Sequence, residues 1–154
     1  MDASTLADLQ AQTFDHATAT TQRSYPPDHR LTREQLARYL DRRQYAVVGT
    51  TRPDGRPHAS MTTFYVRGTS FWLPTLGKAV RVRNLGSCSW LTLVIPEDDD
   101  DDHITVIAEG PAEVLALEDV PEDVRSLNGM DWIGCWIELK AERVLSYAAD
   151  DAKP

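Results

Sequence analysis

The sequence predicts a mainly β protein with short helices, arranged as a small closed or partly closed antiparallel barrel. Short β-branched and apolar segments recur along its 154 residues, and their spacing and the turn residues between them favour an antiparallel barrel over a parallel sheet. The spacing gives six or seven strands and two or three short helices. We expect one domain over residues 31–148, an N-terminal extension over 1–30 and a tail over 149–154.

The N-terminal extension is polar and rich in small residues. Leu6, Leu9 and Phe14 are spaced as in a short amphipathic helix, although disorder or packing against a partner fits this composition equally well. Pro26 and Pro27 end any helix before the barrel begins.

The barrel is preceded by a helix that the sequence marks clearly at its start. Thr32 is followed three positions later by Gln35, which is the pattern of a capping box. Its apolar stripe consists of Leu36, Tyr39 and Leu40. The helix is expected to end near Arg43 and to cover one mouth of the barrel or one face of the sheet.

Three strands joined by two turns follow this helix. Tyr45–Thr51 is apolar and β-branched, and Pro53-Asp54-Gly55 supplies a tight turn. The side chains then alternate over Pro57–Val66. One face carries His58, Ser60, Thr62, Phe64 and Val66, and the other carries Ala59, Met61, Thr63 and Tyr65. A turn at Gly68 leads to a third strand at Ser70–Leu73.

The second half of the chain contributes the remaining strands, at Ser89–Ile95, His103–Glu109, Ala112–Leu117 and Trp132–Leu139. Arg143–Tyr147 either extends the last of them or forms one more strand. Gly110-Pro111 marks a bulge or bend, and Leu117–Leu127 is expected to form a short helix.

The five aspartates of Asp98–Asp102 raise the question of a calcium site. An EF-hand loop needs ligands at alternating positions, an internal glycine and a terminal glutamate, and this run has none of these. A solvated hairpin loop is therefore the preferred interpretation.

Charge and hydropathy limit the partners. The net charge is −8 and the mean hydropathy is −0.40, which argues against a nucleic-acid-binding protein and fits a small anionic ligand better. No apolar run approaches the roughly 20 residues that span a bilayer, and the first residues lack the layout of a secretory signal. We expect no membrane association and a cytoplasmic location.

The motifs of side-chain catalysis are missing from the sequence. It contains no P-loop, GxGxxG, HExxH or nucleophile elbow, and Cys88 and Cys135 are expected to be reduced thiols in the core. The four histidines fall in separate segments, so no metal site is predicted: His16, His29, His58 and His103. If the protein is an enzyme, a cofactor is expected to carry the reaction.

One short segment concentrates positive charge. Lys78, Arg81 and Arg83, with the Thr75 hydroxyl and the backbone N–H groups at the start of a helical turn, are suited to hold a phosphate. The alternative is that these cations form a solvated helix face. The four tryptophans are expected in the core more than beside a cofactor: Trp72, Trp90, Trp132 and Trp136.

The order of motifs resembles a known family. They are Asp54-Gly55-Arg56-Pro57, His58-Ala59-Ser60-Met61-Thr62, Phe71 to Thr75, Arg81-Val82-Arg83-Asn84-Leu85 and Glu109-Gly110-Pro111-Ala112-Glu113. In this order they resemble the pyridoxamine-5'-phosphate-oxidase-like, flavin-binding split-barrel superfamily. Gly86-Ser87-Cys88 replaces the N-P-R step usual after the helix, and the chain lacks the family's R-x-R ending, which argues against vitamin B6 chemistry.

The resemblance implies a six-stranded antiparallel split β-barrel of the flavin-binding type. It also implies a homodimer with two cofactor sites at the subunit interface, and FMN or the deazaflavin coenzyme F420 as the cofactor. The residues that it assigns to the cofactor are His58, Ser60, Met61, Thr62, Thr63, Thr75, Lys78, Arg81, Arg83, Asn84 and Trp132. It assigns no catalytic side chain.

Two functions from different classes follow. The first is an oxidoreductase that transfers hydride between FMN, or F420, and a small conjugated or quinone-like substrate. The second is a non-catalytic split-barrel protein that binds a flavin, haem or another ligand for storage or sensing. A dimeric interaction module whose site has decayed is a third possibility.

Overall fold

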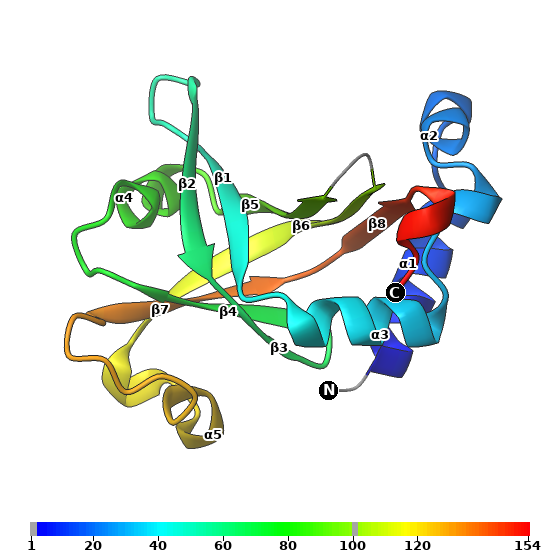
Figure 1. Cartoon of the computed structure of the whole chain (residues 1–154). Helices are drawn as coiled ribbons and strands as arrows, with labels where there is room; N and C mark the ends of the chain where they lie inside the picture. Colours follow the sequence, from blue (N-terminus) through cyan, green and yellow to red (C-terminus); the bar gives the residue numbers. More distant parts are fainter. Residues whose placement is uncertain (1–2, 100–101) are drawn as a thin grey trace.

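The structure is a computed structural model that describes residues 3–99 and 102–154. One antiparallel sheet of eight strands curls into a half-barrel, with helices at its two ends (Figure 1). The strands are β1 (Tyr45–Thr51), β2 (Pro57–Thr63), β3 (Tyr65–Arg67), β4 (Ser70–Thr75), β5 (Trp90–Asp99), β6 (Asp102–Ala116), β7 (Cys135–Lys140) and β8 (Arg143–Ala148). They are ordered β2-β1-β5-β6-β7-β4-β3, and β8 pairs with β6. The predicted fold class is confirmed as mainly β with short helices.

The predicted strand counts, six or seven from the spacing and six from the resemblance, were slightly too low, and one reason lies at Phe64. The expected strand Pro57–Val66 is divided there, because its first part pairs with β1 and its second with β4. Between the two parts, the Phe64 N–H donates to the Gln44 carbonyl at 3.3 Å. β2 and β3 are therefore the two edges of the sheet, although they follow each other in the chain.

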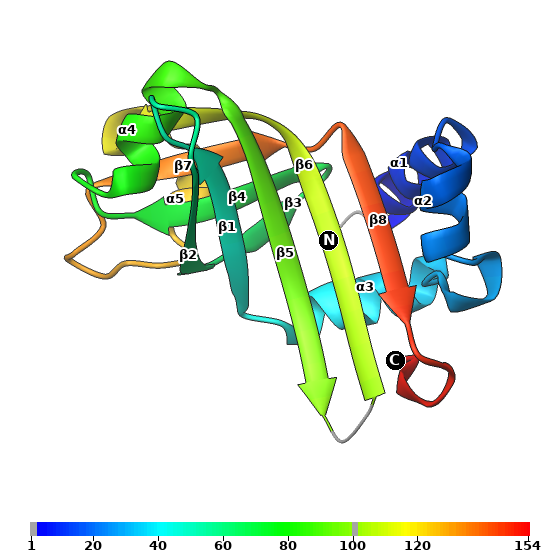
Figure 2. The ribbon, with the colours of Figure 1, turned by 90° about the horizontal axis from the view of Figure 1, so that it is seen from above.

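β6 joins the two halves of the half-barrel. Its first part pairs with β5 and β8, and its second part, from Ala112, pairs with β7 (Figure 2). The change of partner comes at the predicted Gly110-Pro111 bend. A Cβ atom at Gly110 would clash with the carbonyl oxygen of Lys140, so only glycine fits there.

The hairpin of β1 and β2 follows the sequence prediction closely. Gly55 has φ of +85°, the Arg52 N–H donates to the Arg56 carbonyl, and Asp54 accepts a bond from the Arg56 N–H. The turn is centred on Asp54 and therefore pairs Tyr45 with Thr63.

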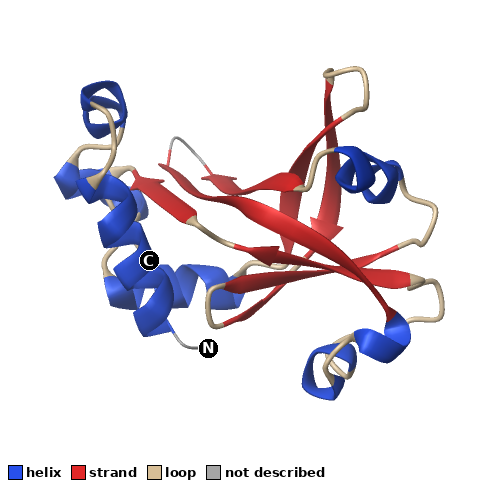
Figure 3. Ribbon diagram, turned by 180° about the vertical axis from the view of Figure 1, so that it is seen from behind, coloured by secondary structure: helices blue, strands red, loops and turns tan. Residues whose placement is uncertain are grey.

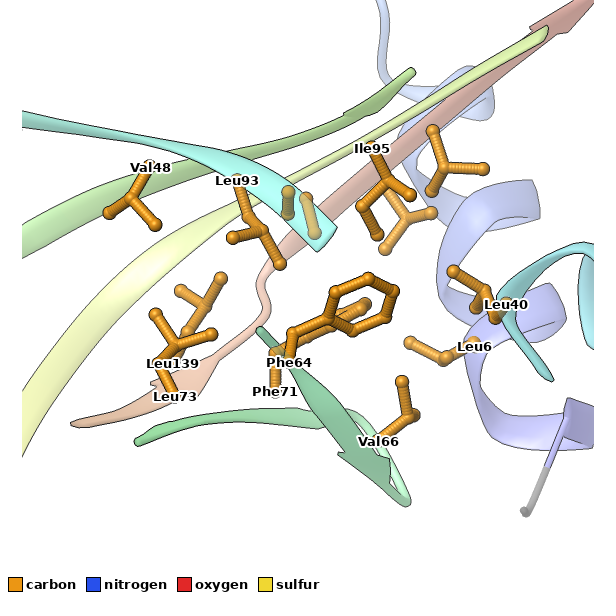
Figure 4. Close-up of a cluster of buried hydrophobic side chains, with 14 of the residues drawn as sticks. Leu6, Leu40, Val48, Phe64, Val66, Phe71, Leu73, Leu93, Ile95 and Leu139 are labelled. Atoms are coloured by element: carbon orange, nitrogen blue, oxygen red, sulfur yellow. The ribbon is translucent and has the colours of Figure 1, made fainter. Parts of the chain in front are cut away.

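The main core fills the concave side of the sheet, where buried side chains of β1, β3, β4, β5 and β7 meet residues of the helices (Figure 4). α3 (Arg33–Arg42) closes this core with the predicted stripe, and both hydrogen bonds of the capping box at Thr32 and Gln35 are present. The buried Tyr39 hydroxyl donates to the Ile95 carbonyl at 2.9 Å, which ties α3 to β5.

The N-terminal segment is helical and packs on the barrel. α1 (Ala3–Asp15), α2 (Ala19–Ser24) and the short η1 (Pro27–His29) lie at the same end of the sheet as α3 (Figure 3). Leu6 is fully buried in the main core. Gln10 donates to the Leu31 carbonyl and accepts a hydrogen bond from Ser146, so polar contacts also hold α1 on β8.

The remaining segments differ from the predictions in detail. The expected helix Leu117–Leu127 is interrupted before Pro121, giving η2 (Leu117–Asp119) and α5 (Glu122–Arg125), and η3 (Asp150–Ala152) lies near the C-terminus. β5 and β6 pair as far as Asp99 with Asp102, so the ordered hairpin is longer than expected. Residues 100 and 101 of the predicted aspartate loop lie outside the described residues.

Both cysteines are free thiols, as predicted; Cys135 is buried, and Cys88 is half-buried. Within residues 3–99 and 102–154, no group of three potential ligands is placed to hold a metal ion. No helix of this described part is long and apolar enough to cross a bilayer.

Candidate functional site

An open pocket of about 520 Å³ lies between β2, the start of α4 (Val80–Ser87) and the loop before β7. Its lining residues are Tyr45, Met61, Thr62, Thr63, Leu76, Ala79, Arg81 and Trp132. Met61, Thr62, Thr63, Arg81 and Trp132 were predicted as site residues from the sequence. The fold thus brings four separate segments of the chain to one cavity.

Arg81 is the central polar group of this pocket. Its side chain is held by two hydroxyl groups: Nε donates to Thr75 Oγ1 at 3.3 Å, and Nη1 donates to Ser60 Oγ at 3.2 Å. Arg81 is only 9% exposed, and no carboxylate among the described residues forms an ion pair with it. A buried guanidinium without a counter-charge is unfavourable unless an anion reaches it.

Burial changes the protonation equilibria around Arg81. Loss of hydration lowers the pKa of Arg81 from its ordinary value, and the nearby Cys135 opposes this shift. Burial raises the pKa of the Cys135 thiol, and Arg81 again acts in the opposite direction. Both shifts have the same cause, the burial of Arg81 and Cys135 at this end of the pocket.

The start of α4 adds further donors beside Arg81. Ala79 is the N-cap residue, and its side chain makes no capping hydrogen bond, so the first N–H groups of the helix have no side-chain cap. Thr75 is fully buried at the end of β4, and Lys78 is exposed in the loop between them. Positive charge and free donors therefore gather at one end of the pocket.

Two glycines bring the loop of Trp132 to the pocket. Gly134 N–H donates to the Thr75 carbonyl at 3.0 Å, and a Cβ atom at Gly134 would lie 2.7 Å from the backbone nitrogen of Gly77. This close approach explains why the predicted strand Trp132–Leu139 was wrong at its start, since β7 begins only at Cys135. Trp132 is 44% exposed and forms a wall of the pocket.

The other tryptophans divide between core and surface. Trp72 and Trp136 are buried, as expected from the sequence, and belong to a second apolar cluster beneath α5. Trp90 is exposed on β5.

Six of the predicted site residues are not among the lining residues: His58, Ser60, Thr75, Lys78, Arg83 and Asn84. Ser60 and Thr75 contact Arg81, and Lys78 is exposed in the loop before α4. Asn84 is fully buried and donates to Thr50 Oγ1 at 3.0 Å, while its own Oδ1 has no partner in the described part of the chain. His58 lines a separate shallow groove with Trp90, and its buried Nδ1 has no partner among the described residues either. Arg83 is exposed on α4.

Sequence reasoning missed Tyr45, Leu76 and Ala79 as lining residues. A signal for Tyr45 was present, because a turn centred on Asp54 places Tyr45 directly opposite Thr63. Leu76 and Ala79 come from a loop whose path depends on the contact between Gly77 and Gly134, which has no sequence signature.

The chemistry that these residues offer is limited. The pocket combines an anion-binding end with an apolar wall of Met61, Leu76 and Trp132. No carboxylate or histidine is among its described lining residues. Proton transfer by a side chain of this chain therefore has no evident donor or acceptor there, apart from Tyr45 and the threonine hydroxyls.

A family model described as pyridoxamine 5'-phosphate oxidase matches residues 32–148. The chain belongs to this family. The match covers the helix α3, the whole sheet and every residue named in the pocket. No curated protein is detectably similar to the chain in sequence.

Several solved structures resemble the chain in fold. A conserved hypothetical protein of Mycobacterium tuberculosis superposes with a TM-score of 0.66 at 20% identity, covering 80% of this chain and 89% of that one. The heme storage protein HutZ of Vibrio cholerae gives 0.59 at 15% identity, with coverages of 75% and 93%. A FAD-binding protein of Mesorhizobium loti gives 0.60 at 13% identity, with coverages of 73% and 91%.

Proposed function

We propose that the protein binds FMN, or the deazaflavin F420, in the pocket around Arg81 and is an oxidoreductase that transfers hydride to or from a small conjugated or quinone-like substrate. The observation that carries this proposal is the buried Arg81, bonded only to hydroxyl groups and facing an open pocket. An anionic group of the cofactor would supply the missing counter-charge.

The residues present fit a flavin with a phosphate group. Arg81 and Lys78, with the first N–H groups of α4, would hold the phosphate. The buried Thr75 hydroxyl, which donates to the Leu73 carbonyl and accepts from Arg81, would orient Arg81 toward it. Met61 and Trp132 offer apolar surface to a flat ring, and Thr62 and Thr63 offer polar groups along its edge. Asn84 donates a hydrogen bond to the Thr50 hydroxyl, and its Oδ1 remains without a donor among the described residues.

A bound flavin would supply hydride transfer, a reaction that none of the described lining side chains can carry out. The residues of the chain bind and orient the ligand and exclude water from its anionic end. The further basic residues Arg56 and Arg83 lie at the surface, where they would suit the longer acidic tail of F420. The phosphate of FMN would need only some of these cations, of which Arg81 and Lys78 lie at the pocket end of α4.

We further propose that the protein is a homodimer, with no nucleic acid or membrane as partner. No helix of the described chain lies over the outer face of β5 and β6 (Figure 2). Tyr45, Met61 and Trp90 are exposed on strands of this sheet.

Light scattering should give twice the chain mass, and Ala59→Arg on the outer face of β2 should give the monomer. A monomeric wild type would refute the dimer.

The experiment for cofactor binding is a fluorescence and absorbance titration of the full chain with FMN, FAD and F420. Arg81→Met should weaken binding of the preferred flavin at least tenfold, because the phosphate loses its buried partner. Arg23→Met is the matched control, since Arg23 is an exposed arginine on α2, at the other end of the molecule. Equal affinities of the Arg81 variant and the wild type would refute the site.

The second candidate is a binding protein without turnover. It is favoured by the lack of carboxylates and histidines among the described lining residues, and a structural relative is a heme storage protein. Titration with hemin and reduction of menadione by the flavin-loaded protein separate the two. Hemin binding without quinone turnover would favour storage, and turnover above free flavin would exclude it.

A further inference from the structure

A second pocket, of about 460 Å³, lies along the segment 63–67, which leads from the end of β2 into β3. Its lining residues are Leu40, Asp41, Arg43, Gln44, Thr63, Phe64, Tyr65, Val66, Arg67 and Asn128. Thr63 lines both pockets. Gln44 lines the second pocket, and the next residue in the chain, Tyr45, lines the first. The two pockets therefore meet at Thr63.

Two arginines give the second pocket a positive balance. Asp41 is its sole acidic residue among those described, against Arg43 and Arg67. Arg67 Nε lies 3.7 Å from Asp123, whose side chain is mostly exposed, so water screens this pair strongly. Its Nη1 also donates to the neutral Val66 carbonyl at 2.8 Å, and neither contact neutralises the charge of Arg67.

Arg43 is also incompletely paired. Its Nη1 lies 3.4 Å from Glu97, a carboxylate that accepts a shorter bond, of 2.6 Å, from Arg42. Its Nη2 donates to the Pro96 carbonyl, and its buried Nε has no partner among the described residues. A buried donor without an acceptor is costly, which favours an acceptor from a ligand.

The remaining lining suits a flat molecule. Tyr65 and Arg67 alternate with the core residue Val66, so their side chains share the outer face of β3. The Tyr65 ring packs at 47° to Trp136 with centroids 6.0 Å apart, which restrains it. Gln44 and Asn128 add amide groups at the rim.

We propose that this second pocket binds the carboxylate of a small planar conjugated acid through Arg67 and Arg43, and that the substrate reaches across Thr63 toward the first pocket. The role as a substrate site rests on the proposed flavin function. The binding of the acid itself does not.

The test uses benzoate and its neutral isostere benzamide as probes, followed by amide shifts in NMR spectra of the full, flavin-free chain. Benzoate should bind at least tenfold more tightly than benzamide and shift the amides of Gln44, Tyr65, Arg67 and Asn128. Equal affinities of the two probes, or shifts centred on Thr75 and Arg81, would overturn the proposal.

A variant tests the assignment of the cation. Arg67→Gln should weaken benzoate binding at least tenfold and leave the flavin affinity of the first pocket unchanged, whereas the control Arg23→Gln should change neither. Unchanged benzoate binding in Arg67→Gln would overturn the role of Arg67. Because benzoate binding is measured without flavin, a failed flavin titration would refute the proposed function and leave this site standing.

Discussion

Arg81 combines two properties that conflict in a ligand-free protein. It is buried, and its partners are the neutral hydroxyl groups of Ser60 and Thr75. Removing a guanidinium from water costs several kcal/mol, and neutral hydroxyls recover only part of that. The residue is therefore better explained by a ligand than by the stability of the fold.

This argument predicts that Arg81→Met will not destabilise the ligand-free protein. The free energy of unfolding should stay the same or rise by about 1 kcal/mol, because an apolar side chain of similar length needs no counter-charge. Urea denaturation of the flavin-free protein measures it. A loss of about 2 kcal/mol or more would mean that the hydroxyl bonds of Arg81 stabilise the fold.

Tyr39 gives the protein a pH dependence in alkaline solution. Burial raises the pKa of Tyr39 from its ordinary value of 10.0 to about 12. The folded state keeps a proton that the unfolded state loses above pH 10. The stability from this proton is therefore complete below pH 10 and is lost as the pH rises toward 12.

Comparison with Tyr39→Phe isolates this effect. At pH 8 the variant should be about 1 kcal/mol less stable, because it lacks the bond from Tyr39 to the Ile95 carbonyl. By pH 11 the difference should shrink by about 1 kcal/mol, since only the wild type has the tyrosine to titrate. Urea denaturation at both pH values measures it, and parallel pH profiles would contradict the assignment.

At the scale of the element, β6 depends on a single glycine. Gly110→Ala places a methyl group against the Lys140 carbonyl and within 3.0 Å of the Glu142 nitrogen. Since both are backbone atoms, the strand itself must move, and we expect a loss of about 3 kcal/mol or more.

The matched control is Gly86→Ala in α4, where an added Cβ meets nothing within 4 Å. Alanine there should stabilise the helix by about 0.5–1 kcal/mol. Thermal melting of the two variants should shift in opposite directions. Equal shifts would show that the close contact at Gly110 is not what requires glycine.

Elements with local signals were predicted well from the sequence. The capping box of Thr32 and Gln35 and the turn at Gly55 each depend on residues only a few positions apart, and both are confirmed. The division of Pro57–Val66 at Phe64 depends on pairing with β4, which alternation along one strand does not reveal. The late start of β7 depends likewise on Gly77, far away in the chain.

At the scale of the whole molecule, the pocket is a product of the curled sheet. Ser60, Arg81 and Trp132 come from three segments that local patterns cannot place together. Resemblance to a family identified most of the lining residues, because members of the family share the fold that brings these motifs together. The second pocket, with Arg43 and Arg67, matches no motif and became apparent only in three dimensions.

β6 also determines how the chain must fold. Because it pairs with β5, β7 and β8, neither half of the sheet is complete without it. β7 and β8 come after β6 in the chain, and β7 must also pair with β4, which lies more than fifty residues earlier. Such a topology has many contacts between distant residues, so we expect slow folding in one cooperative step, with no half-barrel that persists alone.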